Sequence, residues 1–169
     1  MKQVVVVGTG IMAVGIAAGF LATSHQVILL GRTQSRAKEQ ETEILALTKT
    51  MNSDWEASGA KLVTGEIASW ADWSEVIWVI ETIKEDMQLK QELFASLDQR
   101  VPEHIPIGSN SSGFPISKIS AGLKTAHRMF NAHYFMPAHI VPLVEVVLGE
   151  KSDPVMGEQV CQLYRQAKK

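Results

Sequence analysis

Residues 4–17 of the chain read VVVVGTGIMAVGIA, and two interpretations of this stretch compete. A lysine followed by apolar residues, as at the start of this chain, is also the pattern of a secretory signal. A signal requires an unbroken apolar region before a small-residue cleavage site, whereas glycines and a threonine interrupt this one. A buried strand, a glycine turn and a helix explain every part of the stretch. The sequence therefore predicts a strand–turn–helix unit.

The glycine turn of this unit has the spacing G-x-G-x-x-A. Val4–Val7 is a β-branched run, typical of a strand that is covered on both faces. Gly8 and Gly10 allow a tight turn and a close approach of the backbone to a pyrophosphate. A helix that begins at Ile11 would point its first backbone amides, those of Ile11 and Met12, at the phosphates. The unit predicts dinucleotide binding at these four turn residues.

Length and composition fit a single globular domain in the cytoplasm. The chain has 169 residues, of which 46% are hydrophobic and 20% charged, and its net charge is −2. No basic run is longer than Lys168-Lys169, so nothing indicates a nucleic acid or an anionic membrane as partner. No unbroken apolar segment reaches the ~18 residues of a membrane span. The single Cys161 excludes an intramolecular disulfide and is expected to be a small buried residue of the last helix.

Strand and helix patterns alternate along the rest of the chain. Further strands are predicted at residues 26–30, 61–64, 76–80, 105–109, 129–135 and 143–148, and further helices at 35–50, 84–100, 116–122 and from 153 to the end. The inner face of the helix at 84–100 is predicted to carry Met87, Leu89, Leu93, Phe94 and Leu97. This alternation predicts a Rossmann-type, doubly wound α/β domain, with a mainly parallel sheet and helices on both faces. Ligands of such sheets bind beyond the carboxyl ends of the strands.

The segment after the second predicted strand bears on the choice of cofactor. NAD-selective folds usually place Asp or Glu there, to accept hydrogen bonds from the ribose 2′-hydroxyl. In this chain residues 30–36 read LGRTQSR, without an acidic residue. Arg32, Thr33, Ser35 and Arg36 can donate hydrogen bonds to the 2′-phosphate of NADP, which an acidic residue would repel. The sequence therefore favours NADP over NAD, the alternative being a solvated turn with idle arginines.

A histidine and a glutamate lie on the last two predicted strands. His133 is near the carboxyl end of one strand, and Glu145 lies inside the next, between Val144 and Val146. A carboxylate in such an apolar strand is unfavourable unless it is paired. Paired with His133, it would fix the imidazole tautomer and stabilise imidazolium, which suits a general base near neutral pH. His139 is the competing candidate and is interpreted as a loop residue, and no third ligand with metal-site spacing is visible.

With these residues in view, the chain resembles the nucleotide-binding domain of the 3-hydroxyacyl-CoA dehydrogenase family over nearly all its length. GTGIMAVGIA is similar to the family's glycine turn, with Ala13 where Gly is commoner. ETIKEDMQLKQELF resembles its E-x-I-x-E motif and the following helix, and SNSSGFPISKI its S-N-T-S-S segment. AHYFMP and LVEVV are similar to its H-F-F-N-P and L-V-E-V pair.

The resemblance implies roles for individual residues. His133 would be the general base, Glu145 its partner, and Ser112, 21 residues before the histidine as in the family's motif, would hydrogen-bond the substrate oxygen. The candidates on the cofactor side are Thr82, Glu85, Lys90 and Asn110. On pattern alone, Glu85 and Lys90 are charges on the surface of a helix and Ser112 is a turn residue.

The chain departs from the family pattern at three places. Met136 stands where the family has an asparagine near the nicotinamide, and Gly31-Arg32 replaces the acidic residue after the second strand. The stretch from Arg36 to Lys61 is shorter and less basic than the helical excursion that helps to hold coenzyme A. Two substrate classes therefore stay open, a 3-hydroxyacyl-CoA and a smaller hydroxy acid, as in the gulonate- and carnitine-oxidising relatives.

The expected function is hydride transfer between a secondary alcohol of the 3-hydroxyacyl type and NADP, or NAD as the family default, in fatty acid metabolism. Family members continue into a helical domain that completes the substrate site and forms the dimer interface, and residues 1–169 contain no counterpart. We therefore expect the chain alone to bind cofactor and turn over substrate slowly. The alternatives are a nucleotide-sensing module and a decarboxylating β-hydroxyacid dehydrogenase, although the latter's G-x-x-x-K helix is not found.

Overall fold

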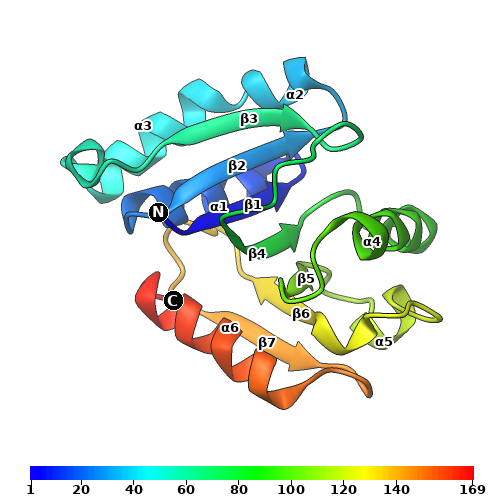
Figure 1. Ribbon diagram of the computed structural model, residues 1–169. Helices are drawn as coiled ribbons and strands as arrows, with labels where there is room; N and C mark the ends of the chain where they lie inside the picture. Colours follow the sequence, from blue (N-terminus) through cyan, green and yellow to red (C-terminus); the bar gives the residue numbers. More distant parts are fainter.

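Seven strands form one sheet in the order β3-β2-β1-β4-β5-β6-β7. The computed structural model describes residues 1–169 (Figure 1). The strands are β1 (Gln3–Val7), β2 (Gln26–Gly31), β3 (Leu62–Glu66), β4 (Val76–Glu81), β5 (Ile107–Ser109), β6 (Met129–Tyr134) and β7 (Val144–Leu148). All neighbours are parallel except β6 and β7. The predicted α/β class and mainly parallel sheet are confirmed.

The helices cover both faces of this sheet. They are α1 (Ile11–Ala22), α2 (Gln34–Lys38), α3 (Glu41–Met51), α4 (Met87–Arg100), α5 (Ile116–Ile119) and α6 (Pro154–Gln166), with short 3₁₀ turns at Trp55–Ser58 and Ala126–Arg128. Val4 and Val6 of β1 pack in a core with residues of α1, α3 and α6. Val5 and Val7 face a second core with residues of α4 and α5. Side chains alternate along a strand, so an unbroken valine run serves two cores.

The bounds of two predicted helices differ most from the structure, and the helix predicted at 116–122 ends at Ile119. The helix expected at residues 35–50 is split into α2 and α3, of which α2 lies against β2 and β3 whereas α3 lies against α1. The helix expected from Lys84 begins at Met87, because Asp86 caps it by accepting a hydrogen bond from Leu89 N at 3.1 Å. Residues 84–86 therefore form a loop at the edge of the sheet.

Single residues also differ from the prediction. Leu89, expected on the inner face of α4, is 44% exposed, because its position on the first turn faces the edge of the sheet. Cys161 is half-buried instead of fully buried. None of the helices combines the length and the apolar character that crossing a membrane requires.

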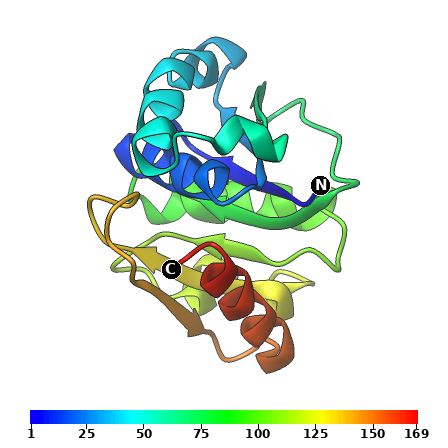
Figure 2. The ribbon, with the colours of Figure 1, turned by 90° about the vertical axis from the view of Figure 1, so that its left-hand side faces the viewer.

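The loops that carry the predicted site residues leave the sheet on one side. The carboxyl ends of β1, β2, β4 and β5 lead into Gly8, Arg32, Thr82 and Asn110, so these residues gather at one edge. Figure 2 views the molecule from the opposite edge, where the N and C marks of both chain ends lie. These four residues therefore share the edge at which parallel sheets bind ligands.

Candidate dinucleotide and proton-transfer site

The glycine turn is held against β2 and β4 by backbone hydrogen bonds. Gly8 N donates to Leu30 O at 2.9 Å, and Thr82 N donates to Val7 O at 2.8 Å. Gly8 has φ +129°, and a side chain there would collide with Thr82, whose carbonyl oxygen would lie 3.0 Å from the added Cβ. Only glycine fits this position without strain.

The first turn of α1 offers free backbone donors. Gly10 is its N-cap, and no side chain caps the turn. The first amides of a helix have no partner within the helix, and the helix dipole makes this end attractive to anions. Ile11, which is 70% exposed, and Met12 stand at the mouth of this turn. The arrangement suits a pyrophosphate.

Two adjoining cavities open at this edge. The first, of about 380 Å³, is lined by Gly8, Thr9, Gly10, Ile11, Met12, Arg32, Thr82, Ile83 and Lys84. The second, of about 470 Å³, is lined mainly by apolar residues, namely Val7, Leu30, Ile67, Ile83, Leu89 and Leu93, together with Gly8, Gly31, Arg32 and Lys84. An apolar cavity beside a glycine turn fits a nucleotide base beside its phosphates.

Of the residues proposed to read the ribose, only Arg32 lines these cavities. Thr33 is the N-cap of α2, where its Oγ1 accepts a hydrogen bond from Arg36 N at 3.3 Å. Arg36 is exposed and lines neither cavity. Gly31 leaves no room for a side chain, because an added Cβ would lie 2.8 Å from Thr33 O. The backbone here thus excludes an acidic side chain at position 31.

A charged network that the sequence did not reveal lies buried at the end of β4. Glu81 is 0% exposed and Lys90 is 1% exposed, and Lys90 Nζ lies 2.6 Å from Glu81 Oε1. Ser109 Oγ and Ile83 N also donate to this carboxylate, each at 2.6 Å. Burial raises the pKa of Glu81, against the opposing charge of Lys90. Lys90 is therefore not a surface charge of α4, as pattern alone predicted, but the buried partner of Glu81.

Glu85 connects the loop after β4 to the loop after β5. Its Oε1 accepts hydrogen bonds from Ser111 Oγ and, at 3.3 Å, from Gly113 N. Partial burial alone would raise the pKa of Glu85, but the Ser111 hydrogen bond, the Lys90 charge and the Gly113 amide together lower it. Glu85, expected on the surface of a helix or beside the cofactor, therefore holds the loop that carries Ser112.

Two asparagines hold the same loop from β5 and β6. Asn110 Oδ1 accepts a hydrogen bond from Tyr134 N at 2.8 Å. Asn131 accepts from Ile116 N at 2.7 Å and donates to Phe114 O at 3.0 Å. Ser112, at the tip of this loop, is exposed and makes no side-chain hydrogen bond within the chain. The loop is thereby fixed beside the carboxyl end of β6, with Ser112 available to a ligand.

His133 and Glu145 lie directly opposite each other on β6 and β7. His133 Nδ1 lies 2.9 Å from Glu145 Oε2, and the side chains are 24% and 52% exposed. The second ring nitrogen, Nε2, has no partner in the chain and is open to a ligand. Asn110, through its hydrogen bond to Tyr134, brings the Ser112 loop beside this pair. The geometry of the pair is that of a general base with a carboxylate that orients it.

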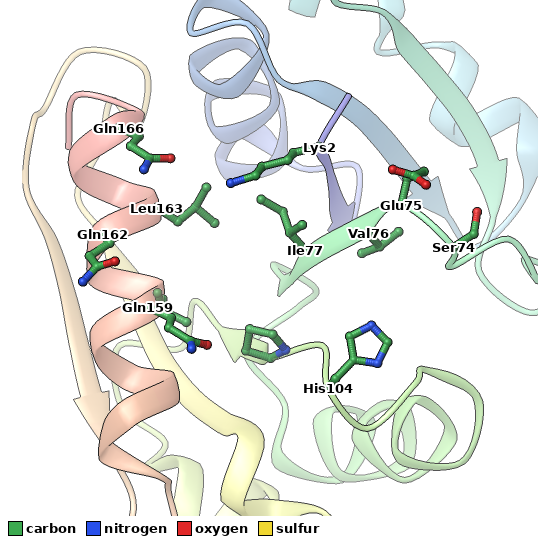
Figure 3. A pocket seen from close by; sticks show the side chains of 12 residues that line it. Lys2, Ser74, Glu75, Val76, Ile77, His104, Gln159, Gln162, Leu163 and Gln166 are labelled. Atoms are coloured by element: carbon green, nitrogen blue, oxygen red, sulfur yellow. The ribbon is translucent and has the colours of Figure 1, made fainter.

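Another cavity lies at the opposite edge of the sheet. It has about 450 Å³ and is lined by Gln159, Gln162 and Gln166 of α6 on one side and by Glu75 and His104 on the other (Figure 3).

His139 is in a turn, as expected, and lies away from His133 on the segment between β6 and β7. No cluster of His, Cys, Asp and Glu side chains is arranged to hold a metal ion.

The parallel sheet, the glycine turn and the two adjoining cavities define a dinucleotide-binding domain. The sequence matches the family described as 3-hydroxyacyl-CoA dehydrogenase, NAD binding domain, over residues 3–169. The chain belongs to this family, and the resemblance inferred from its motifs is confirmed.

Individual relatives agree with this assignment. The chain is 32% identical to a peroxisomal fatty acid beta-oxidation multifunctional protein of Arabidopsis thaliana, over 87% of this chain and 21% of the relative. It is 31% identical to an L-carnitine dehydrogenase of Nocardiopsis dassonvillei, over 100% of this chain and 52% of the relative. The chain therefore spans about a fifth of the one and half of the other.

Solved structures share the fold. A 3-hydroxybutyryl-CoA dehydrogenase from Escherichia coli K12 superposes with a TM-score of 0.84 at 26% identity, over 99% of this chain and 37% of that one. An (S)-3-hydroxybutyryl-CoA dehydrogenase from Ralstonia eutropha superposes with a TM-score of 0.87 at 24% identity, over 100% and 62%. The latter likeness concerns the fold alone.

Proposed function

We propose that the chain is the nucleotide-binding half of a dehydrogenase that oxidises a secondary alcohol of the 3-hydroxyacyl type, or reduces the corresponding ketone. The observation that carries this proposal is the His133–Glu145 pair, 2.9 Å apart on neighbouring strands beside the Ser112 loop. When bound, the nicotinamide supplies the acceptor for the hydride. His133 Nε2 takes the hydroxyl proton, Glu145 stabilises the resulting imidazolium, and Ser112 Oγ orients the substrate oxygen.

The substrate is either a 3-hydroxyacyl-CoA or a smaller 3-hydroxy acid. The names of the relatives include both a fatty acid beta-oxidation protein and an L-carnitine dehydrogenase, which supports keeping both classes. We propose NADP as the preferred cofactor. Support comes from Arg32 at the junction of the two cavities and from Gly31, whose surroundings exclude the acidic side chain that NAD selection uses.

Turnover by a His133→Gln variant of a catalytically competent longer form tests the proton-transfer role. General-base catalysis contributes about 10²–10⁴-fold, so the variant should lose that factor in kcat with 3-hydroxybutyryl-CoA or L-carnitine. The dissociation constant for NADP should stay within about twofold, because His133 lines neither nucleotide cavity. His139→Gln, in the turn between β6 and β7, is the matched control and should change neither quantity. Full activity of His133→Gln in a catalytically competent longer form would refute the mechanism, and NADP binding without turnover by such a longer form would favour a nucleotide-sensing module.

A further inference from the structure

Arg32 and Lys84 stand on opposite sides of the glycine turn. Arg32 follows β2, and Lys84 belongs to the loop between β4 and α4. The strand between β2 and β4 is β1, which leads into the glycine turn. Both cations line both cavities, so a ligand that spans the two cavities passes between them.

The charges of these two residues are not neutralised within the chain. Both are exposed, and neither takes part in an ion pair. No Asp or Glu lines either cavity. The acids beside Lys84 in sequence are engaged elsewhere, because Glu85 accepts hydrogen bonds from the Ser111 loop and Asp86 caps α4. The junction is therefore a place with two free cations and no opposing carboxylate.

The lining of the two cavities fixes which part of a dinucleotide meets this junction. The glycine turn and the uncapped start of α1 suit the pyrophosphate. The cavity of Leu30, Ile67, Leu89 and Leu93 suits the apolar face of the adenine base. The adenosine ribose, which links the base to the pyrophosphate, would then lie at the junction between Arg32 and Lys84. A phosphate on its 2′-oxygen would face these two cations.

We propose that Lys84 is a specificity-determining residue that binds the 2′-phosphate of NADP from the side opposite to Arg32. This inference rests on the proposed binding of NADP by the same site. Lys84 contributes a compact ammonium and Arg32 a planar guanidinium to the binding of the 2′-phosphate. The loop position of Lys84 is set by its backbone, because Asp86 N donates to Lys84 O at 2.8 Å.

Calorimetric titration of the chain with NADP and with NAD, in matched low-salt buffer, tests the proposal. Lys84→Gln should weaken NADP binding roughly three- to tenfold, the range for a charge-assisted contact at an exposed position, and change NAD binding by less than about twofold. Lys84→Arg should retain most of the NADP affinity. Lys61→Gln, an exposed lysine just before β3 at the other edge of the sheet, is the charge-matched control and should have no effect.

The variants separate failure of this inference from failure of the proposed cofactor. If the unmutated chain prefers NADP, and Arg32→Gln removes that preference while Lys84→Gln does not, the role of Lys84 is refuted and the proposed cofactor stands. Equal losses of NADP and NAD affinity in Lys84→Gln would also refute it, since they would assign the lysine to the pyrophosphate. Equal or tighter binding of NAD by the unmutated chain would overturn both.

Discussion

Replacing Lys90 with methionine removes the cation of the buried network at the end of β4. Methionine retains an unbranched apolar stem, so the change is mainly one of charge. It leaves Glu81, 0% exposed, with the two neutral donors Ser109 Oγ and Ile83 N, each at 2.6 Å. Removing one partner of a buried ion pair typically destabilises a protein by about 3–5 kcal/mol.

Protonation of Glu81 sets a ceiling on this loss. From an ordinary glutamate pKa of about 4.3, protonation costs about 1.36 × 2.7 ≈ 3.7 kcal/mol at pH 7 and about 1 kcal/mol at pH 5. The folded variant can protonate Glu81 instead of keeping an unpaired buried charge, so the loss from this charge does not exceed the ceiling. We expect Lys90→Met to lower the free energy of unfolding by about 3 kcal/mol at pH 7 and by less than about 1 kcal/mol at pH 5.

Proton linkage explains why the loss of stability in Lys90→Met increases as pH rises. A carboxyl group whose folded-state pKa is raised contributes stability that is complete below its unfolded pKa and is lost as pH rises through the folded pKa. Urea denaturation followed by circular dichroism between pH 5 and pH 8 measures the effect. Lys38→Met, at an exposed position on α2, is the control, and the double variant Lys90→Met/Glu81→Gln should recover most of the loss. A loss that is independent of pH, or a double variant no more stable than the single one, would refute the reasoning.

Two further perturbations test the supports of the site. Glu85→Ala should lower the free energy of unfolding by about 1 kcal/mol at pH 7, because it removes the acceptor for Ser111 and Gly113. The pKa of Glu85 is lowered in the folded state, so the stability that its carboxylate contributes is lost as pH falls. The variant and the unmutated chain should therefore have equal free energies of unfolding below about pH 4 in urea titrations. A difference that persists below that pH would contradict the assigned role of Glu85. Arg128→Lys should lower the free energy of unfolding by about 3 kcal/mol, because an ammonium cannot satisfy all the acceptors of the guanidinium. The fully buried guanidinium donates to Thr125 Oγ1 and to the carbonyls of Asp98, Val101, Pro102 and Ile105. A loss below about 1 kcal/mol in thermal or urea unfolding would show that those carbonyls find other partners.

The fold could be predicted because its signals are local. Val4–Val7 and residues 76–80 are apolar runs that only a strand with two covered faces explains, and the glycine turn between strand and helix fixes the start of the sheet. The split between α2 and α3 could not be predicted, because the two helices pack on different partners, α2 on β2 and β3 and α3 on α1. Such contacts between distant segments leave no periodic pattern in the sequence.

The candidate site, too, could be predicted from the sequence only in part. Pairing of His133 with Glu145 was predictable, since a carboxylate inside an apolar strand needs a partner and neighbouring strands supply one. The burial of Lys90 was not, because a lysine on an amphipathic helix ordinarily faces water, and only the carboxylate that ends β4 turns it inward. One signal was available: Glu81 ends a buried strand, nine residues before Lys90, where an unpaired carboxylate would be unfavourable.

The buried network links the two cavities at the glycine turn to the loop that carries Ser112. Glu81 accepts a hydrogen bond from the backbone of Ile83, which lines both cavities, and another from Ser109, which precedes the serine loop. Lys90 lies 3.4 Å from Glu85, which holds that loop through Ser111. The loops after β4 and β5 are thus fixed by one set of charges that are unfavourable to expose or separate. These contacts hold the loop of Ser112 and the walls of the cavities relative to each other, which is the arrangement that the proposed hydride transfer would require.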